Sequence, residues 1–405
     1  MSESGVHWHP RTLAVRGGLS RSGFDETAEA LYLTSGFVYE SAEQAEAAFK
    51  DEVEHYIYSR YGNPTVTVFE ERMRLLEEAE ACFATASGMS AVFTALAALA
   101  RAGDRVVASR ALFGSCFVIL DEILPRWGVE TVFVDGADLE QWQEALAVPT
   151  AAVFFETPSN PMQELVDIPA VSDLAHAAGA QVVVDNVFGT PVFSHPLAHG
   201  ADIVVYSATK HIDGQGRTLG GAILGRKEFI EGPVKNLMRH TGPAMSPFNA
   251  WVLAKGLETL DLRVRRMAES ALEVATTLER WGAQGRGVLR VLFPHLASHP
   301  QHPLALRQLE GGGGTVVTFD VVGGRAGAFA FLNALELIDI SNNLGDAKSL
   351  TTHPATTTHR RLEPAARAAV GITDGTIRVS VGLEDVRDIV ADLDAGLSAA
   401  AAVAG

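Results

Sequence analysis

The centre of the chain alternates between short apolar runs and stretches with helical periodicity. Six runs rich in Val, Ile and Phe occupy residues 105–109, 131–135, 151–157, 181–186, 202–210 and 220–225. Stretches such as 65–80 and 169–180 lie before or between them and carry apolar residues at helical spacing. Apolar runs that alternate with helices predict βαβ units, whose strands are buried on both faces. We therefore expect an α/β fold with a mostly parallel sheet flanked by helices over residues 66–254.

The two ends of the chain follow other patterns. Residues 1–65 lack a strand rhythm and predict an N-terminal arm with short helices. Residues 254–283 predict one long helix, and the strand-like runs 314–322 and 376–382 follow it. We expect a smaller C-terminal α+β domain over residues 255–405. Its Ala-rich tail after Leu393 should form a helix that frays.

Composition and charge exclude several classes of partner. The chain has 405 residues, 47% of them hydrophobic, so it can bury a large core. Its net charge of −17 argues against nucleic acid and against anionic membrane surfaces, because both bind basic faces. The apolar stretch 91–100 ends at Arg101 and is too short to span a membrane. Two cysteines, Cys82 and Cys116, fit a reducing compartment, and we expect a cytoplasmic protein.

Three features of the central region point to one ligand. Asp185 ends an apolar run, and Lys210 follows the next one. Ser87, Gly88 and Met89 begin an apolar helix, whose free N–H groups suit a phosphate. Carboxyl ends of parallel strands share one crevice, so these groups can face one molecule. Pyridoxal 5'-phosphate needs all three: a lysine for its aldehyde, a carboxylate for its ring nitrogen and a cradle for its phosphate.

Each feature also has a simpler interpretation. Lys210 is compatible with a solvated strand end, Asp185 with a helix cap, and Ser87 with an ordinary helix start. Rival cofactors fit less well, because the chain has no G-x-G-x-x-G after a strand and no P-loop. The histidine-rich stretches 7–9, 295–302 and 353–359 lack paired cysteines and an H-E-x-x-H motif, so we expect no metal.

The chain resembles the Cys/Met metabolism family of pyridoxal-phosphate enzymes over nearly its whole length. Eight stretches carry the resemblance in one order: "YSRYGNPT" (58–65), "ATASGMSA" (84–91), "ETPSNP" (156–161), "VVDNVFGTP" (183–191), "SATKHIDGQGR" (207–217), "KGLETL" (255–260), "SLTTHPATTTH" (349–359) and "RVSVGLED" (378–385). The resemblance implies a fold-type I enzyme, usually a tetramer of two active dimers. It implies an arm that reaches the neighbouring subunit.

The resemblance also implies roles for single residues. Lys210 would be the Schiff-base lysine and Asp185 the partner of the pyridinium nitrogen. The remaining cofactor contacts would be Ser87, Gly88, Met89, Ser207 and Thr209 at the phosphate, Phe113 on the ring, and Tyr58 and Arg60 at the phosphate of the neighbouring subunit. Arg378 would bind the substrate α-carboxylate as a fork, with Asn160 and Ser349 lining the substrate face.

Two departures from the common family pattern bear on the reaction. Phe113 stands where the family usually has a tyrosine, so this side chain can stack but cannot carry a proton. Gln215, Gly216 and Arg217 replace a histidine and an acid. "LFGS" and "DGQGR" are similar to the O-succinylhomoserine sulfhydrylase branch, which implies γ-replacement of succinate by sulfide to give homocysteine. Arg110 or Arg217 would then meet the charge of the succinyl group.

Other functions remain open at this point. Cystathionine γ-synthases use cysteine in place of sulfide, O-acetylhomoserine sulfhydrylases use another ester, and γ-lyases release a 2-oxoacid. All of them share one cofactor site, so the sequence separates them poorly. A scaffold protein that keeps the fold is a further alternative. It is disfavoured because Lys210, Asp185, Arg60 and Arg378 are all present.

Overall fold

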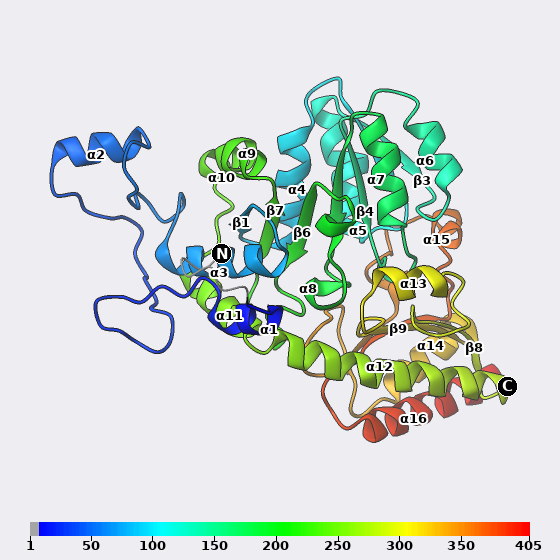
Figure 1. Cartoon of the computed structure of the whole chain (residues 1–405). Coiled ribbons are helices and arrows are strands. Elements are labelled where there is room, and N and C mark those ends of the chain that lie inside the picture. The colour runs from blue at the N-terminus through cyan, green and yellow to red at the C-terminus, as the bar shows by residue number, and fades with distance from the viewer. Residues whose placement is uncertain (1–7) are drawn as a thin grey trace.

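The computed structural model describes residues 8–405 and contains two sheets (Figure 1). The helices are α1 (Pro10–Arg16), α2 (Ala42–Phe49), α3 (Pro64–Leu76), α4 (Gly88–Leu99), α5 (Gly114–Val118), α6 (Leu139–Ala145), α7 (Ile168–Ala177), α8 (Thr190–Phe193), α9 (Lys227–Phe229), α10 (Lys235–Thr241), α11 (Pro247–Leu257), α12 (Leu260–Ala283), α13 (His302–Gln308), α14 (Gly324–Asn333), α15 (Pro364–Ala369) and α16 (Val386–Ala404). Among the described helices, none combines the length and the apolar character that crossing a membrane requires.

The larger sheet has seven strands in the order β1-β7-β6-β5-β4-β2-β3. They are β1 (Ala81–Thr85), β2 (Arg105–Ser109), β3 (Glu130–Val134), β4 (Ala152–Glu156), β5 (Gln181–Asp185), β6 (Ile203–Ser207) and β7 (Gly221–Gly225). All six predicted runs are strands of this sheet, and the mostly parallel α/β fold is confirmed. The run at 220–225 is antiparallel to its neighbours, contrary to a purely parallel reading. It is linked to β6 by a loop without a crossover helix, which a parallel neighbour would need.

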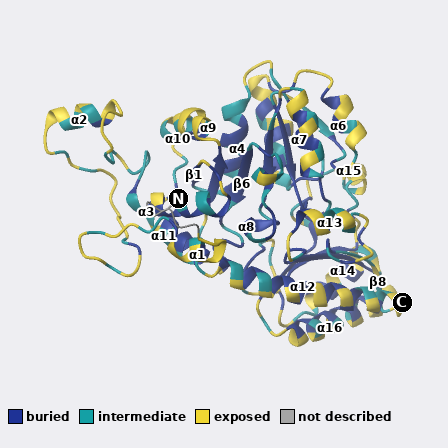
Figure 2. Cartoon of the chain, viewed as in Figure 1, coloured by how far each residue is buried: buried dark blue, intermediate teal, exposed yellow. Residues whose placement is uncertain are grey.

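Helices cover both faces of this sheet because alternate side chains of each strand point to opposite sides. Val183 packs in the core under α4 and α5, whereas Val182 and Val184 pack under α6 and α7. α3 and α11 cover the part of that second face near β6 and β7. In Figure 2 the strands are the most completely buried part of the chain. The sheet therefore fixes the ends of its strands rigidly.

The smaller sheet has five strands in the order β10-β11-β12-β9-β8. They are β8 (Val288–Leu292), β9 (Val316–Val321), β10 (Asp339–Ile340), β11 (Leu350–Thr352) and β12 (Thr376–Ser380). α12, α14 and α16 pack on one face. The expectation that the tail after Leu393 frays is wrong, since α16 continues to Ala404 and Ala400 is buried against this core.

The single long helix predicted for 254–283 is also wrong. The chain breaks between α11 and α12 at Glu258 and Thr259. The Arg263 guanidinium stabilises this break by donating to the carbonyl of Gly256 (2.8 Å) and to the hydroxyl of Thr259 (3.1 Å). Apolar periodicity continues across the break because both helices pack on the same core, so the pattern alone could not locate it.

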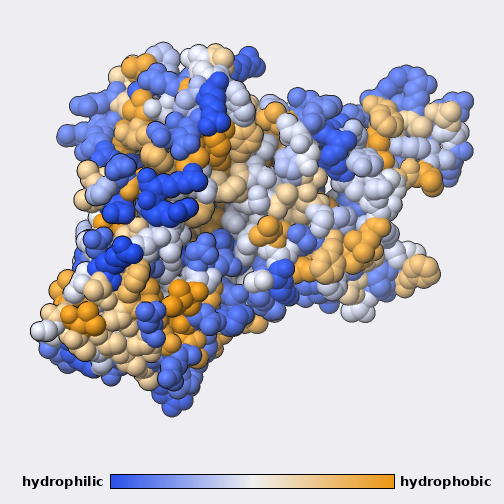
Figure 3. Space-filling view, turned by 180° about the vertical axis from the view of Figure 1, so that it is seen from behind, coloured by the Kyte–Doolittle hydropathy of each residue, from blue (hydrophilic) through white to orange (hydrophobic). Residues whose placement is uncertain are grey.

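The N-terminal segment extends from the body, with α2 lying away from both sheets (Figure 1). Its large apolar side chains are unusually exposed: Phe24 is 93% and Val38 91% accessible in this chain. Seen from behind, apolar side chains appear on the surface of the extension (Figure 3). The predicted domain boundaries near residues 65 and 254 remain predictions.

Candidate functional site

Two acidic side chains meet at the carboxyl edge of the larger sheet. β4 ends at Glu156 and β5 at Asp185, and these two residues are direct partners in the strand register. β5 lies beside β6, which ends at Ser207 and leads into the turn with Lys210. The strand-end rule that predicted Asp185 and Lys210 at one edge therefore agrees with the topology.

Asp185 lies in surroundings that hold it in place and favour its neutral form. Its carboxylate accepts a hydrogen bond from the N–H of Val187 (3.0 Å). Burial raises the pKa of Asp185 to about 7. A cationic ring nitrogen placed against this carboxylate would lower that pKa again, because an opposite charge favours the ionised form.

Lys210 lies in the turn that follows β6, at the same edge of the sheet. Its Nζ donates to Oδ1 of Asn343 at 2.5 Å. Burial, and next the positive charge of Arg378, lower the pKa of Lys210 to about 8. A lysine with this pKa supplies a neutral amine near physiological pH, which both carbonyl addition and proton abstraction require.

Arg378 lies on β12 and is connected to the same loop. Its Nη1 donates to Oδ1 of Asn160 (3.0 Å), and its Nη2 donates to the carbonyls of Asn342 and Asn343 (3.0 Å each). Burial lowers the pKa of Arg378 to about 10. Within residues 8–405 its Nε has no partner although it is buried. A buried donor without an acceptor fits a site for a carboxylate from outside the chain.

A candidate anion cradle lies where β6 meets the start of α4. Ser87 caps the helix by accepting from the N–H of Ser90 (3.2 Å). The first helical hydrogen bond is donated by Ala91, so the N–H groups of Gly88 and Met89 precede it. A Cβ on Gly88 would lie 2.5 Å from Cβ of Ser207, which shows how closely the strand end approaches the helix. The lysine, carboxylate and cradle together fit pyridoxal phosphate.

Thr209 and Phe113 border these groups. The Thr209 hydroxyl accepts from the N–H of Gly220 (3.1 Å), which fixes the turn before Lys210. Phe113 precedes α5, and its N–H donates to Oε1 of Glu156 (2.6 Å). The ring of Phe113 is partly buried against the apolar core under α4.

Glu156 is a functional candidate that the sequence analysis missed. Besides Phe113 it accepts from the N–H of Asn160 (3.4 Å). Its carboxyl group lies within 4.8 Å of the carboxyl group of Asp185 and of the thiol of Cys116. In the described part of the chain, this is the one cluster of three or more Asp, Glu, Cys or His side chains with ligand atoms this close together. Burial, and next Asp185, raise the pKa of Glu156 to about 8. The sequence did carry a signal for Glu156, because this residue lies near the end of the apolar run 151–157, just before the run that contains Asp185.

Several predicted substrate residues have other partners in this chain. The Ser349 hydroxyl donates to Glu384 (2.9 Å) and accepts from the N–H of Gly382 (2.9 Å). Arg110 donates to the side-chain carbonyl of Gln141 (2.8 Å). The structure thus brings Asn160 together with Arg378, and it gives Ser349 and Arg110 hydrogen-bond partners of their own.

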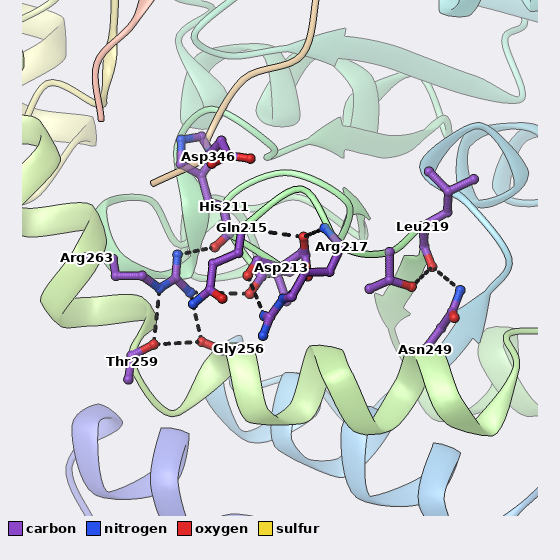
Figure 4. A network of polar contacts seen from close by, with 12 residues as sticks. His211, Asp213, Gln215, Arg217, Leu219, Asn249, Gly256, Thr259, Arg263 and Asp346 are labelled. Carbon is purple, nitrogen blue, oxygen red and sulfur yellow. Dashed lines mark hydrogen bonds and ion pairs between the residues drawn. The ribbon is translucent and has the colours of Figure 1, made fainter. Parts of the chain in front are cut away.

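The "DGQGR" stretch forms the structural network of Figure 4. Arg217 pairs with the buried carboxylate of Asp213, with 3.0 Å between Nε and Oδ1. Arg263 donates to the carbonyl of His211 (2.8 Å) from beneath the same loop. Gly214 has a positive φ of 65°, and a Cβ there would lie 1.9 Å from Arg263. This stretch therefore fixes the loop after Lys210.

Tyr58 and Arg60 lie near the end of the N-terminal arm, residues 1–65. The Arg60 guanidinium stacks over Tyr58 (5.3 Å) and Tyr61 (4.8 Å), and it donates to the carbonyl of Arg239. Among the described residues, no hydrogen bond joins Tyr58 or Arg60 to Lys210. Of the histidine-rich stretches, His7 lies outside the described residues, and His353 bonds Thr356 (2.9 Å).

Known proteins resemble this chain over nearly its full length. The family model described as "Cys/Met metabolism PLP-dependent enzyme" matches residues 11–398. An O-succinylhomoserine sulfhydrylase of Mycobacterium tuberculosis is 65% identical, over 96% of this chain and 95% of the relative. An L-methionine gamma-lyase of Treponema denticola is 41% identical, over 95% of each chain. The structure of a cystathionine gamma synthase from Xanthomonas oryzae, 33% identical, superimposes with a TM-score of 0.92 over 98% of this chain and 100% of that one.

Proposed function

Because the chain belongs to the Cys/Met metabolism family of PLP-dependent enzymes, we propose that it replaces the succinyl group of O-succinylhomoserine by sulfide. The products are homocysteine and succinate, as in methionine biosynthesis. The observation that carries this proposal is the 65% identity to an O-succinylhomoserine sulfhydrylase across nearly the whole of both chains. The family resemblance and the cofactor predicted from the sequence are confirmed by the family match.

The strand-end groups would hold the cofactor. Asp185 would hold the ring nitrogen, and the N–H groups of Gly88 and Met89 would hold the phosphate with the hydroxyls of Ser207 and Thr209. Lys210 would bind the aldehyde carbon covalently. When bound, pyridoxal phosphate accepts the electron pair that remains after a proton leaves the substrate.

Proton transfer falls to Lys210 in this proposal. Its lowered pKa makes the neutral amine available to take the Cα proton and to return protons later. Arg378 would hold the α-carboxylate, with Asn160 fixing the orientation of the fork. Phe113 would only stack on the cofactor ring, since it has no ionisable group. Any proton transfer that the tyrosine of other family members performs would then fall to Lys210 or to water.

The exposed apolar arm supports an oligomer. Phe24 and Val38 on the arm are almost fully accessible in one chain, and large exposed apolar surfaces are typical of interfaces. We propose a homotetramer of two active dimers, in which Tyr58 and Arg60 reach the phosphate in the neighbouring subunit. The small-molecule substrates and the two free thiols fit a cytoplasmic enzyme.

A γ-lyase is the second candidate, because a methionine γ-lyase is 41% identical. To separate the two, the holoenzyme is given O-succinylhomoserine with sulfide in one reaction and L-methionine alone in another. The proposal predicts homocysteine in the first and little 2-oxoacid in the second. Faster release of 2-oxoacid from methionine than of homocysteine from the ester would reject the proposal.

A further inference from the structure

The leaving group of the proposed substrate needs a cation. If the proposed function holds, the succinyl group carries a terminal carboxylate that an acetyl group lacks. A carboxylate that enters a cleft needs charged donors to replace its water. Arg110 and Arg217 are poor candidates, because Gln141 binds the first and the buried carboxylate of Asp213 neutralises the second.

A cleft of about 790 Å³ begins at the candidate cofactor site. Ser87 and Met89 at the start of α4 line it, and so do Gly114 and Ser115, which directly follow Phe113. The segment 357–362 lines it as well. A group leaving the substrate beside Phe113 therefore has this segment as a neighbour.

Thr358 and His359 anchor that segment. A Cβ on Gly114 would lie 2.6 Å from the Thr358 carbonyl, so the segment packs directly on the turn after Phe113. The His359 ring is buried, and its Nδ1 lies 2.8 Å from the hydroxyl of Thr358. Its Nε2 has no partner within the described residues. These contacts fix the backbone position of the next two residues, Arg360 and Arg361.

Arg360 and Arg361 follow His359, line the cleft and are exposed. Among residues 8–405 neither guanidinium makes a hydrogen bond or an ion pair, although Asp121 and Glu122 line the same cleft. We propose that Arg360 and Arg361 bind the terminal carboxylate of the succinyl group and so select O-succinylhomoserine over its acetyl analogue. Arginine suits this task because its planar fork matches a carboxylate.

The test compares the two esters. The double variant Arg360→Ala/Arg361→Ala should lower the ratio of kcat/KM for O-succinylhomoserine over O-acetylhomoserine by roughly tenfold to a hundredfold, while the acetyl value changes little. Arg360→Lys/Arg361→Lys keeps the charge but loses the fork, so it should retain only part of the preference. The matched control is Arg280→Ala, an exposed arginine on α12 outside the cleft, which should leave the ratio unchanged.

Binding of free succinate to the holoenzyme, measured by calorimetry, is the second measurement. The Ala double variant should bind succinate about tenfold or more weakly, with acetate unaffected. Equal losses for both esters, or unchanged succinate binding, would overturn the subsite. If the wild-type protein makes homocysteine from neither ester, the proposed function fails. In that case succinate binding alone tests the subsite: weaker binding by the Ala double variant supports it, and unchanged binding overturns it.

Discussion

Lys210 derives its chemistry from its place after β6. The neighbouring sheet removes water from the amine, and Arg378 adds a like charge, so the pKa falls to about 8. The same burial raises the pKa of Asp185 to about 7. The pKa of the amine is lowered and the pKa of the carboxyl group is raised at the same edge of the sheet. Pairs of groups with such opposite pKa shifts are typical of functional sites.

Replacing Lys210 tests the covalent attachment. Borohydride reduction of the holoenzyme should add the mass of the pyridoxyl phosphate group to one peptide containing Lys210. Lys210→Ala should gain no such mass and should lose about a thousandfold in turnover, because it also lacks the proton carrier. Lys227→Ala, an exposed lysine on α9, is the control. The adduct on another lysine would contradict the assignment.

Glu77 gives a prediction for pH. It accepts from the Tyr206 hydroxyl, and burial raises its pKa to about 8. From about pH 4.5 to 8 the folded chain then keeps a proton that the unfolded chain has released, so the free energy of unfolding falls as pH rises. Glu77→Gln removes this dependence.

The free energy of unfolding of Glu77→Gln, taken relative to that of the wild type, should therefore rise with pH. The rise should reach up to about 4 kcal/mol between pH 5 and 8. Urea unfolding of the apoprotein at several pH values measures it. A difference that stays constant across this range would show that Glu77 is ionised in the folded protein.

At the scale of elements, the site depends on how closely β6 approaches the start of α4. Gly88 permits this approach, because any side chain there would meet both Cα and Cβ of Ser207. The proposed anion cradle therefore depends on the contact between two elements, not on one helix alone.

Gly88→Ala should move α4 away from β6 and weaken pyridoxal phosphate binding by about tenfold or more, because fewer N–H groups reach the phosphate. Titration of the apoprotein with the cofactor, followed by absorbance, gives the dissociation constant. Gly232→Ala is the matched control, since nothing lies within 4 Å of a Cβ there. Equal affinity of both variants would refute the cradle.

Elements were predictable from the sequence where one periodicity dominated, and less so where tertiary contacts decided. The six strand runs and the site edge followed from apolar patterning and from the strand-end rule. The direction of β7 and the break before α12 depended on a loop path and on Arg263, which no local pattern encodes. Glu156 was missed because the sequence does not show that β4 pairs with β5 in the register that brings Glu156 beside Asp185. The ion pair of Arg217 with Asp213 likewise became visible only in the folded loop.

At the scale of the whole molecule, the active site of a single chain is incomplete if Arg60 has its proposed role. Arg60 contacts Tyr61 and Arg239 rather than Lys210 within its own chain. Its proposed role therefore lies in the active site of the neighbouring subunit. This arrangement requires that active sites be built from two chains.

Mixing two inactive variants tests shared sites. Arg60→Ala and Lys210→Ala homomers should each be nearly inactive. After the subunits are mixed and exchanged, half of the dimers are hybrids with one intact site, so about a quarter of wild-type activity should return. No recovery despite proven subunit exchange would show that Arg60 acts within its own chain.

The choice of sulfur donor separates a sulfhydrylase from a cystathionine γ-synthase. The yellow holoenzyme is given O-succinylhomoserine with equal concentrations of sulfide and cysteine, and the products are identified by mass. A sulfhydrylase should form mostly homocysteine, released together with succinate. Mostly cystathionine would contradict the proposed function and would make the chain a cystathionine γ-synthase built on the same cofactor site.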